Sequence, residues 1–502
     1  ITRKEIKIAI FISFLVIYEY ISGIHKLKTL MNFSIGVILG WIYSFIAVVL
    51  IVNVVLKNRD SVKTLAWVLV LLFLPILGAF LYFFFGRDKR KERMIGRRLM
   101  SQINQRNLSA NVSRCIPDLP QEYSTLHTYF CNTSSAYALP AQSIDVIADT
   151  KKYALMLMRE LERAEKHIHM LFYIFEDDEF GRSIRDILMR KARQGVEVRL
   201  IYDSVGCWSV KKDFFDDMRS AGVYVESFLK VRFPLFSKKL NYRNHRKLVV
   251  IDGVTGFVGG CNIADRYITG GIWGYWRDTV LLVRGMAVQG LQFAFLVDWY
   301  FANHSLVSGQ KYFPQQQQCN GGWLQLVTSN PVGEVRTLMS GTVKMLSLAK
   351  NYVYLHTPYF MPNESFMLSL KSAALSGVDV RLMIPERCDN RIAGYASKSY
   401  LGDLLKVGVK VYLYKGGFLH SKAIVCDDYL SSVGSVNLDF RSFYYNFEVS
   451  AFVYDKTVAQ ELKEHFLNDI KVCKQLTLAE YRSRSFGRRF AESCARLFSP
   501  LM

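Results

Sequence analysis

The sequence lacks the closely spaced cysteines that bind zinc or build a disulfide framework. Its nine cysteines are scattered between Cys115 and Cys494, and no C-x2-C pair occurs among them. We therefore expect reduced thiols in a cytosolic domain and neither a metal ion nor a cofactor. Cys261 and Cys426 stand beside the motifs discussed below. We interpret both as small buried residues, because free cysteine usually behaves as a small hydrophobic residue.

Acidic residues are scarce relative to basic ones. Aspartate and glutamate number 43 against 64 lysines and arginines, which gives a formal net charge of +21. A surplus of this sign is typical of proteins that bind nucleic acid or an anionic membrane surface. Apolar stretches at one end of the chain favour the membrane surface, and we expect no nucleic-acid partner. The composition predicts no particular oligomeric state.

Residues 1–90 are expected to form a transmembrane region, with apolar stretches at 6–24, 34–56 and 64–86. The second and third are long enough to cross a bilayer core of ~30 Å as helices. The first contains Glu19, whose charge is costly inside a bilayer, so it is either a span or an interfacial helix. The basic run at 87–93 predicts a multi-pass protein of the cell membrane, with everything after it on the cytoplasmic side.

The N-terminal sequence does not read as a cleaved secretory signal. The first apolar stretch lacks a clear small-residue cleavage site, and further apolar stretches follow it. Because the sequence begins at Ile1 rather than at methionine, we expect a trimmed chain.

An α/β fold is predicted for the middle of the chain. Residues 91–145 are polar and contain three prolines, and we interpret them as a linker. Beyond them, strand patterns such as 167–175 and 196–202 alternate with helical patterns such as 182–193. The pattern then repeats, since residues 195–203 match 377–385. Internal repetition predicts two similar α/β halves, 146–315 and 316–476, that together form one catalytic domain.

Two segments combine basic and aromatic residues. The first half carries 16 residues (229–244) before its motif, where the second half has only five (415–419). This insert is either a surface loop or a loop that enters the lipid headgroup region. The C-terminal segment, 477–502, has a basic amphipathic pattern. It either packs on the domain or lies on an anionic leaflet, and we favour the leaflet.

One motif occurs twice with identical spacing. It reads H-x-K-x4-D and is followed by G-[GS]-x-N, with 17 residues from histidine to asparagine in both copies. The candidate catalytic residues of the two copies are His245, Lys247, Asp252, His420, Lys422 and Asp427, and the asparagines are Asn262 and Asn437. Lone H-x-K pairs are common, but a duplicated motif with matching aspartate, glycine turn and asparagine is a specific signal.

The spacing suits phosphoryl chemistry. A histidine and a lysine two residues apart in a strand share one face, so imidazole and ammonium lie side by side. Two such halves facing each other supply two histidines to one phosphate. One can attack phosphorus while the other protonates the leaving oxygen. Lys247, Asn262, Lys422 and Asn437 are expected to bind the phosphate and stabilise its charge.

Each half also offers one carboxylate at a matching position. Asp278 and Glu448 occupy aligned places after the two motifs, and we expect them to orient the histidines by binding the second ring nitrogen. A surface salt bridge is the plainer interpretation of each. Asp252 and Asp427 belong to the motif but sit at strand ends before turns, and we read them mainly as structural.

The duplicated motif resembles the phospholipase D superfamily, and the wider pattern is similar to the bacterial cardiolipin synthase family. The supporting phrases run along most of the chain: 241–247, 256–260, 276–278, 357–360, 418–422 and 446–448, with an N-terminal hairpin at 66–78 followed by 85–87. A possible additional N-terminal segment departs from the two-span arrangement expected of that family.

The resemblance implies transfer of a phosphatidyl group from one phosphatidylglycerol to another, with release of glycerol and a phosphatidyl-histidine intermediate. By analogy, His245 is the nucleophile and His420 the acid and base, although the near-symmetric motifs do not decide between them. The alternatives are a phospholipase D or phosphatidyltransferase with another acceptor, a membrane-tethered nuclease of the same superfamily, and a non-catalytic lipid-binding scaffold.

Overall fold

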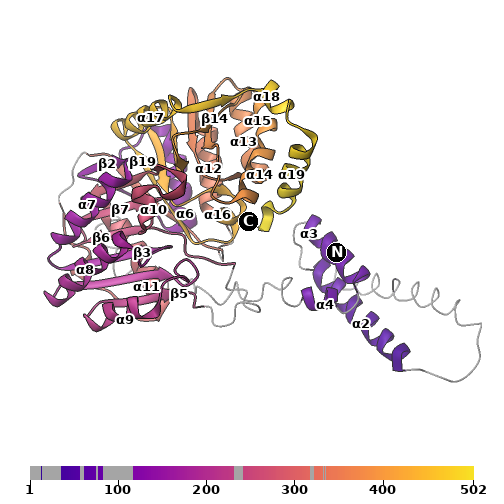
Figure 1. Ribbon diagram of the computed structural model, residues 1–502, viewed down its shortest axis with the longest axis horizontal. Coiled ribbons are helices and arrows are strands. Elements are labelled where there is room, and N and C mark those ends of the chain that lie inside the picture. Colours follow the sequence, from indigo (N-terminus) through magenta and orange to yellow (C-terminus); the bar gives the residue numbers. More distant parts are fainter. Residues whose placement is uncertain are drawn as a thin grey trace, which may run out of the picture. The chain divides into compact units, whose positions relative to one another are not determined.

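The computed structural model describes residues 35–56, 61–74, 77–82, 117–230, 241–316, 321–331 and 335–501, together with residues 13 and 333. The chain divides into two compact units, Ile1–Asp88 and Lys89–Met502. Figure 1 labels many of the elements of both. In the first unit, α2 (Ile35–Leu56), α3 (Ser61–Phe73) and α4 (Leu77–Leu81) meet around the buried side chains of Val54, Leu71 and Tyr82.

The expected membrane spans are only partly covered by described residues. The stretch 6–24 lies outside them apart from residue 13, while 34–56 and 64–86 overlap α2, α3 and α4. Judged on length and apolarity together, none of the helices within the described residues qualifies as a membrane span.

The second unit is built from two sheets that repeat the same topology. In the seven-stranded sheet, the order is β2-β9-β7-β6-β3-β4-β5. Its strands are β2 (Ser143–Ile147), β3 (His167–Phe172), β4 (Glu197–Asp203), β5 (Tyr224–Phe228), β6 (Leu248–Ile251), β7 (Thr255–Gly259) and β9 (Val280–Arg284). Strands β3, β4 and β5 are parallel, whereas β6 runs antiparallel to both β3 and β7.

The nine-stranded sheet contains the same arrangement, in the order β1-β10-β19-β17-β16-β11-β13-β14-β20. Its strands are β1 (Ala138–Pro140), β10 (Trp323–Ser329), β11 (Tyr352–His356), β13 (Asp379–Pro385), β14 (Lys410–Tyr414), β16 (Ala423–Cys426), β17 (Leu430–Gly434), β19 (Glu448–Tyr454) and β20 (Cys473–Leu476). Here β11, β13 and β14 are parallel and β16 is antiparallel to β11 and β17. The predicted duplication of an α/β half is therefore confirmed.

Helices cover the sheets on both sides. The inner faces share one apolar core with α11 (Val288–Asn303) and α17 (Lys456–Ile470). The outer faces carry two further sets of helices: α7 (Thr150–Glu162), α8 (Glu179–Arg193) and α9 (Lys212–Ser220) on one sheet, and α12 (Thr337–Leu348), α13 (Glu364–Leu375) and α14 (Arg391–Ser399) on the other. Apolar residues recur along α8 at helical spacing, and Asp178 caps its first turn by accepting from Gly181 N.

Part of the segment expected to be a linker is folded into the domain. Residues 91–116 lie outside the described residues, but α6 (Gln121–Ser134) packs Tyr123, Leu126 and Phe130 into the core of the second half. Strand β1 then joins the nine-stranded sheet and β2 joins the seven-stranded one. This short stretch therefore ties the two sheets together.

The two halves also pair directly beside the motifs. Strand β15 (Phe418–Leu419) runs parallel to β8 (Trp276–Arg277), and Asn244 forms a parallel bridge with Phe447. Residues 231–240 of the basic-aromatic insert lie outside the described residues. The chain ends in α18 (Leu478–Arg482) and α19 (Phe486–Leu497), and α19 packs along α14.

Candidate active site between the two halves

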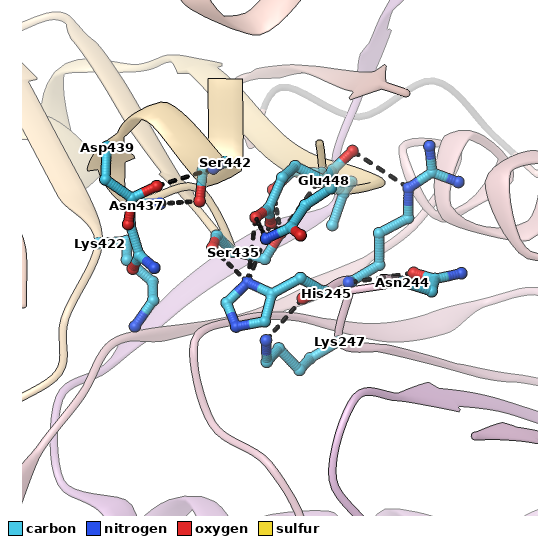
Figure 2. A network of polar contacts seen from close by, with 12 residues as sticks. Asn244, His245, Lys247, Lys422, Ser435, Asn437, Asp439, Ser442 and Glu448 are labelled. Atoms are coloured by element: carbon cyan, nitrogen blue, oxygen red, sulfur yellow. Dashed lines mark hydrogen bonds and ion pairs between the residues drawn. The ribbon is translucent and has the colours of Figure 1, made fainter. Parts of the chain in front are cut away.

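Each motif histidine is held by a carboxylate from the opposite half. His245 Nδ1 lies 3.1 Å from Glu448 Oε1 and 3.1 Å from the carbonyl oxygen of Ser435, as Figure 2 shows. His420 Nδ1 lies 2.6 Å from Asp278 Oδ2. The sequence singled out both carboxylates, one in each half, and the structure exchanges them between the halves.

The backbone explains this exchange. His420 N donates to the carbonyl of Arg277 at 2.8 Å, continuing the parallel pairing of β15 with β8. His245 N donates to the carbonyl of Phe447 at 2.9 Å in the same way. Each histidine is therefore hydrogen-bonded through its own main chain to the residue just before its carboxylate.

The hydrogen bonds assign the tautomer of both rings. Carboxylate and carbonyl oxygens only accept, so Nδ1 carries the proton and Nε2 keeps its lone pair. Burial lowers the pKa of His245, opposed by the charge of Glu448. Burial and the charge of Lys422 lower the pKa of His420 to about 4. Without a bound anion, both rings are neutral near pH 7, with Nε2 available to act as a nucleophile or base.

The same site contains two buried lysines, Lys247 and Lys422. Lys247 Nζ donates to the His245 carbonyl at 2.6 Å, and Lys422 Nζ donates to the His420 carbonyl. Burial lowers the pKa of Lys422 to about 8, and burial together with the charge of Lys422 lowers the pKa of Lys247 well below its ordinary value. A bound anion would relieve both the desolvation and the mutual repulsion of these ammonium groups. Both lysines also lower the pKa of both histidines, which indicates one site rather than two.

The two motif asparagines have different surroundings. Asn262 Oδ1 accepts from Ile174 N at 3.0 Å, and its amide nitrogen donates to the Tyr267 hydroxyl at 2.5 Å. Asn437 is also buried, but its side-chain oxygen has no partner among the described residues. Figure 2 places Asn437 beside Lys422. Asn437 therefore has polar capacity left for a ligand, whereas Asn262 is engaged within the first half.

The structure does not bring the motif aspartates to the histidines. The Asp252 carboxylate accepts from the backbone N–H groups of residues 165–167, at 2.7 to 2.8 Å. Asp427 accepts from residues 350–352 in the same way, at 2.6 to 2.8 Å. Both aspartates adopt a positive φ, 53° and 52°. They bind the backbone at the start of β3 and β11, and their carboxylates are occupied in fixing the strand that precedes the site.

Cys261 and Cys426 are buried beside the motifs, with exposed fractions of 1% and 0%. Burial raises the pKa of both thiols. Neither is poised as a thiolate nucleophile.

Sequence reasoning missed the residues that hold the carboxylates. Ser435 Oγ donates to Glu448 Oε2, and Asn446 Nδ2 donates to Oε1 at 3.0 Å. The residue equivalent to Ser435 is Gly260, where a Cβ atom would lie 2.1 Å from Asp278 Oδ1. The sequence contained a signal for this contact. The first half combines Gly260 with Asp278, and the second half combines Ser435 with Glu448.

Two family models match the chain. One, described as a cardiolipin synthase, phospholipase D-like domain, matches residues 157–271 and 342–470, one segment in each half. The other, described as a phospholipase D-nuclease N-terminal region, matches residues 42–87.

Curated proteins similar to this chain include bacterial cardiolipin synthases. The major cardiolipin synthase of Bacillus subtilis is 39% identical over 484 residues, which cover 93% of this chain and 100% of that one. A cardiolipin synthase of Listeria monocytogenes is 38% identical over 463 residues, covering 90% and 96%. Among solved structures, the phosphatidylserine synthase of Haemophilus influenzae matches with a TM-score of 0.56 at 13% identity, over 75% of this chain and 98% of that one. That likeness shows a shared fold.

Proposed function

The chain belongs to the cardiolipin synthase family of the phospholipase D superfamily, and on that basis we propose that it condenses two phosphatidylglycerol molecules into cardiolipin and glycerol. It is a phosphatidyltransferase. The observation that carries the proposal is the pair of exchanged contacts, His245 with Glu448 and His420 with Asp278, around two buried lysines.

The first step forms a covalent intermediate. His245 Nε2 attacks the phosphorus of the first phosphatidylglycerol, and the bond from phosphorus to the glycerol oxygen breaks. His420, protonated once the anionic phosphate offsets the nearby lysine charges, gives its proton to the departing glycerol oxygen. Its 2.6 Å contact with Asp278 stabilises the imidazolium form and supports this role. Lys247, Lys422 and Asn437 bind the phosphate and stabilise its developing charge. Asn262 stays bound to Ile174 N and to the Tyr267 hydroxyl.

The second step transfers the phosphatidyl group. A free hydroxyl of the second phosphatidylglycerol gives its proton to His420 Nε2, and its oxygen attacks the phosphorus. The bond from phosphorus to His245 Nε2 breaks, which releases cardiolipin and restores both rings. Water in place of the lipid hydroxyl would give phosphatidic acid, the reaction of a phospholipase D.

Membrane attachment at the N-terminus is part of the proposal. The stretches 34–56 and 64–86 are apolar and overlap the segment, 42–87, that matches the N-terminal family model. We propose that they span the cell membrane and that the catalytic unit lies on the cytoplasmic side, where the basic run at 87–93 favours it.

The C-terminal helix supports a second membrane contact. Phe486, Phe490 and Leu497 lie on one face of α19 and are 81%, 62% and 78% exposed. Arg489 and Arg496 flank this face and are exposed as well. The opposite face, with Glu492 and Ala495, is buried. A helix that turns its apolar residues outward and flanks them with arginines suits an anionic leaflet.

The decisive experiment follows product and intermediate together. The full chain in vesicles of labelled phosphatidylglycerol should yield cardiolipin and glycerol in equal amounts, and acid quenching should trap label on a histidine. Peptide mapping assigns that histidine, which we expect to be His245. Phosphatidic acid as the sole product would overturn the synthase assignment, and label on His420 would reverse the two roles.

A further inference from the structure

The two halves carry equivalent arginines beside the site. Arg266 and Arg441 each lie four residues after the motif asparagine. Arg266 belongs to α10 (Asp265–Thr269) and Arg441 to α16 (Phe440–Tyr444). The two short helices follow the glycine turns that close the site, so the arginines occupy matching places around it.

Their partners differ. Arg266 Nη1 lies 3.5 Å from Glu176 Oε1, and its guanidinium lies over the Tyr267 ring. Glu176 lies eight residues after Ile168, which pairs with Ile251 at the end of β6. In the second half, Met361 lies eight residues after Val353, which pairs with Cys426 at the end of β16. Met361 therefore occupies the position equivalent to Glu176. Within the described residues, the half-buried guanidinium of Arg441 has no ion pair and no hydrogen bond.

The other arginines near the motifs are buried and each is paired with an aspartate. The pairs are Arg243 with Asp203 at 3.1 Å, Arg246 with Asp298 at 2.5 Å and Arg277 with Asp469 at 3.0 Å. These ion pairs are part of the domain's structure. Asp439, two residues before Arg441, accepts from Ser442 N at 2.7 Å as the cap of α16 and forms no ion pair with the arginine.

Arg441 is fixed next to the His245 side of the site. Its carbonyl accepts from Asn446 N at 3.0 Å, and the Asn446 side chain holds Glu448. The charge of Arg441 also acts on the Tyr173 phenol, which belongs to the other half. The Tyr173 ring lies 5.1 Å from the His245 ring. Arg441 thus presents a guanidinium that has no partner in the described part of the chain, where the two halves meet.

Cardiolipin formation brings a second phosphate to this place. The reacting phosphate occupies the space between the two lysines. The acceptor lipid carries a phosphodiester of its own, separated from the reacting phosphorus by one glycerol unit. We propose, as an extension of the proposed synthase function, that Arg441 binds the phosphodiester of the acceptor phosphatidylglycerol. An unpaired guanidinium offers two parallel N–H donors, which match the oxygens of a phosphate.

Glycerol exchange separates this role from catalysis. The phosphatidyl-histidine intermediate can also react with free glycerol, which regenerates phosphatidylglycerol and involves no acceptor phosphate. For Arg441→Gln, we expect cardiolipin formation from phosphatidylglycerol vesicles to fall about tenfold or more. Incorporation of labelled glycerol into phosphatidylglycerol should stay within about twofold of wild type. The product ratio should shift from cardiolipin towards phosphatidic acid.

Two matched variants complete the test. Arg441→Lys keeps the charge without the fork of donors and should recover part of the cardiolipin yield. Arg266→Gln, at the equivalent position of the first half, should leave the ratio of cardiolipin formation to glycerol exchange unchanged. Equal loss of both reactions in Arg441→Gln, or a wild-type ratio, overturns the inference. Wild-type protein that makes no cardiolipin overturns the proposed function itself, so the two failures are distinguishable.

Discussion

Nδ1 of His420 lies 2.6 Å from Oδ2 of Asp278, and the two residues belong to different halves of the duplicated domain. The same relationship joins His245 to Glu448. The two motifs are therefore not two sites but complementary parts of one. Each histidine depends on the other half for its tautomer and orientation.

Replacing Asp278 by asparagine should remove the charge that holds His420. The substitution keeps the shape of the side chain, but it no longer fixes Nδ1–H or stabilises the imidazolium. We expect the rate of cardiolipin formation to fall about 100-fold or more, measured with phosphatidylglycerol vesicles. Asp217→Asn, at an exposed position on α9, is the control. A rate within twofold of wild type for Asp278→Asn would contradict an orienting role.

Gly260 should not tolerate a methyl group. A Cβ atom there would lie 2.1 Å from the Asp278 carboxylate, so Gly260→Ala must displace the group that orients His420. We expect at least a tenfold loss of kcat with the fold retained, because the collision involves a single side chain. Gly487→Ala is matched to it, since a Cβ atom at Gly487 meets no atom within 4 Å. Equal rates for the two variants would show that the carboxylate can move without consequence.

Acid should destabilise the domain through a histidine outside the site. Burial lowers the pKa of His167 to about 4, below the ordinary value of 6.5. Between these values the unfolded chain binds the proton and the native state does not, so stability is lost as the pH falls from 6.5 towards 4. Each such histidine contributes a slope of up to ~1.4 kcal/mol per pH unit in this window.

The His167→Gln variant isolates this contribution. Denaturant unfolding of the solubilised protein at pH 7 and pH 5 should show a smaller decrease in stability for the variant than for wild type. The remaining decrease has a second source in His420, whose pKa is also lowered to about 4. An identical decrease in the two proteins would mean that His167 accepts its proton without unfolding.

The exposed face of α19 should enter the lipid. Phe490→Trp places an indole at a position that is 62% exposed in the protein alone. In vesicles that contain anionic lipid, the added fluorescence should shift to the blue and be quenched by brominated acyl chains, because the side chain exchanges water for hydrocarbon. Leu155→Trp, on α7, provides an exposed apolar reference. Quenching no stronger at 490 than at 155 would rule out insertion of this face.

Local sequence patterns predicted the two similar halves and named the candidate site residues. They could not predict the contacts that form between the halves. Repeated strands and equal motif spacing identified His245, His420 and the two carboxylates. Alignment of one half with the other singles out Asp278 and Glu448, but it carries no information on which histidine each one contacts. Strands β8 and β15 decide that point, and each has only two residues, too few to show any periodicity.

Other differences have the same physical origin. Strand β1 has three residues and includes Pro140, so its sequence resembles a linker until β10 pairs with it. Among the described residues, Arg441 lacks an acidic partner and Met361 occupies the place of a glutamate, which is a relationship in space between two distant segments. The role of Ser435 could have been recognised from the sequence. Serine replaces Gly260 in the half in which glutamate, Glu448, replaces the shorter Asp278.

The exchange of carboxylates has a consequence for the order of synthesis. His245 leaves the ribosome with the first half, but Glu448 follows 203 residues later. Asp278 is made early and waits for His420, which comes 142 residues after it. A nascent chain that holds only the first half therefore lacks both the carboxylate that contacts His245 and the whole second motif. The complete site can form only when translation nears its end and the second half packs on the first.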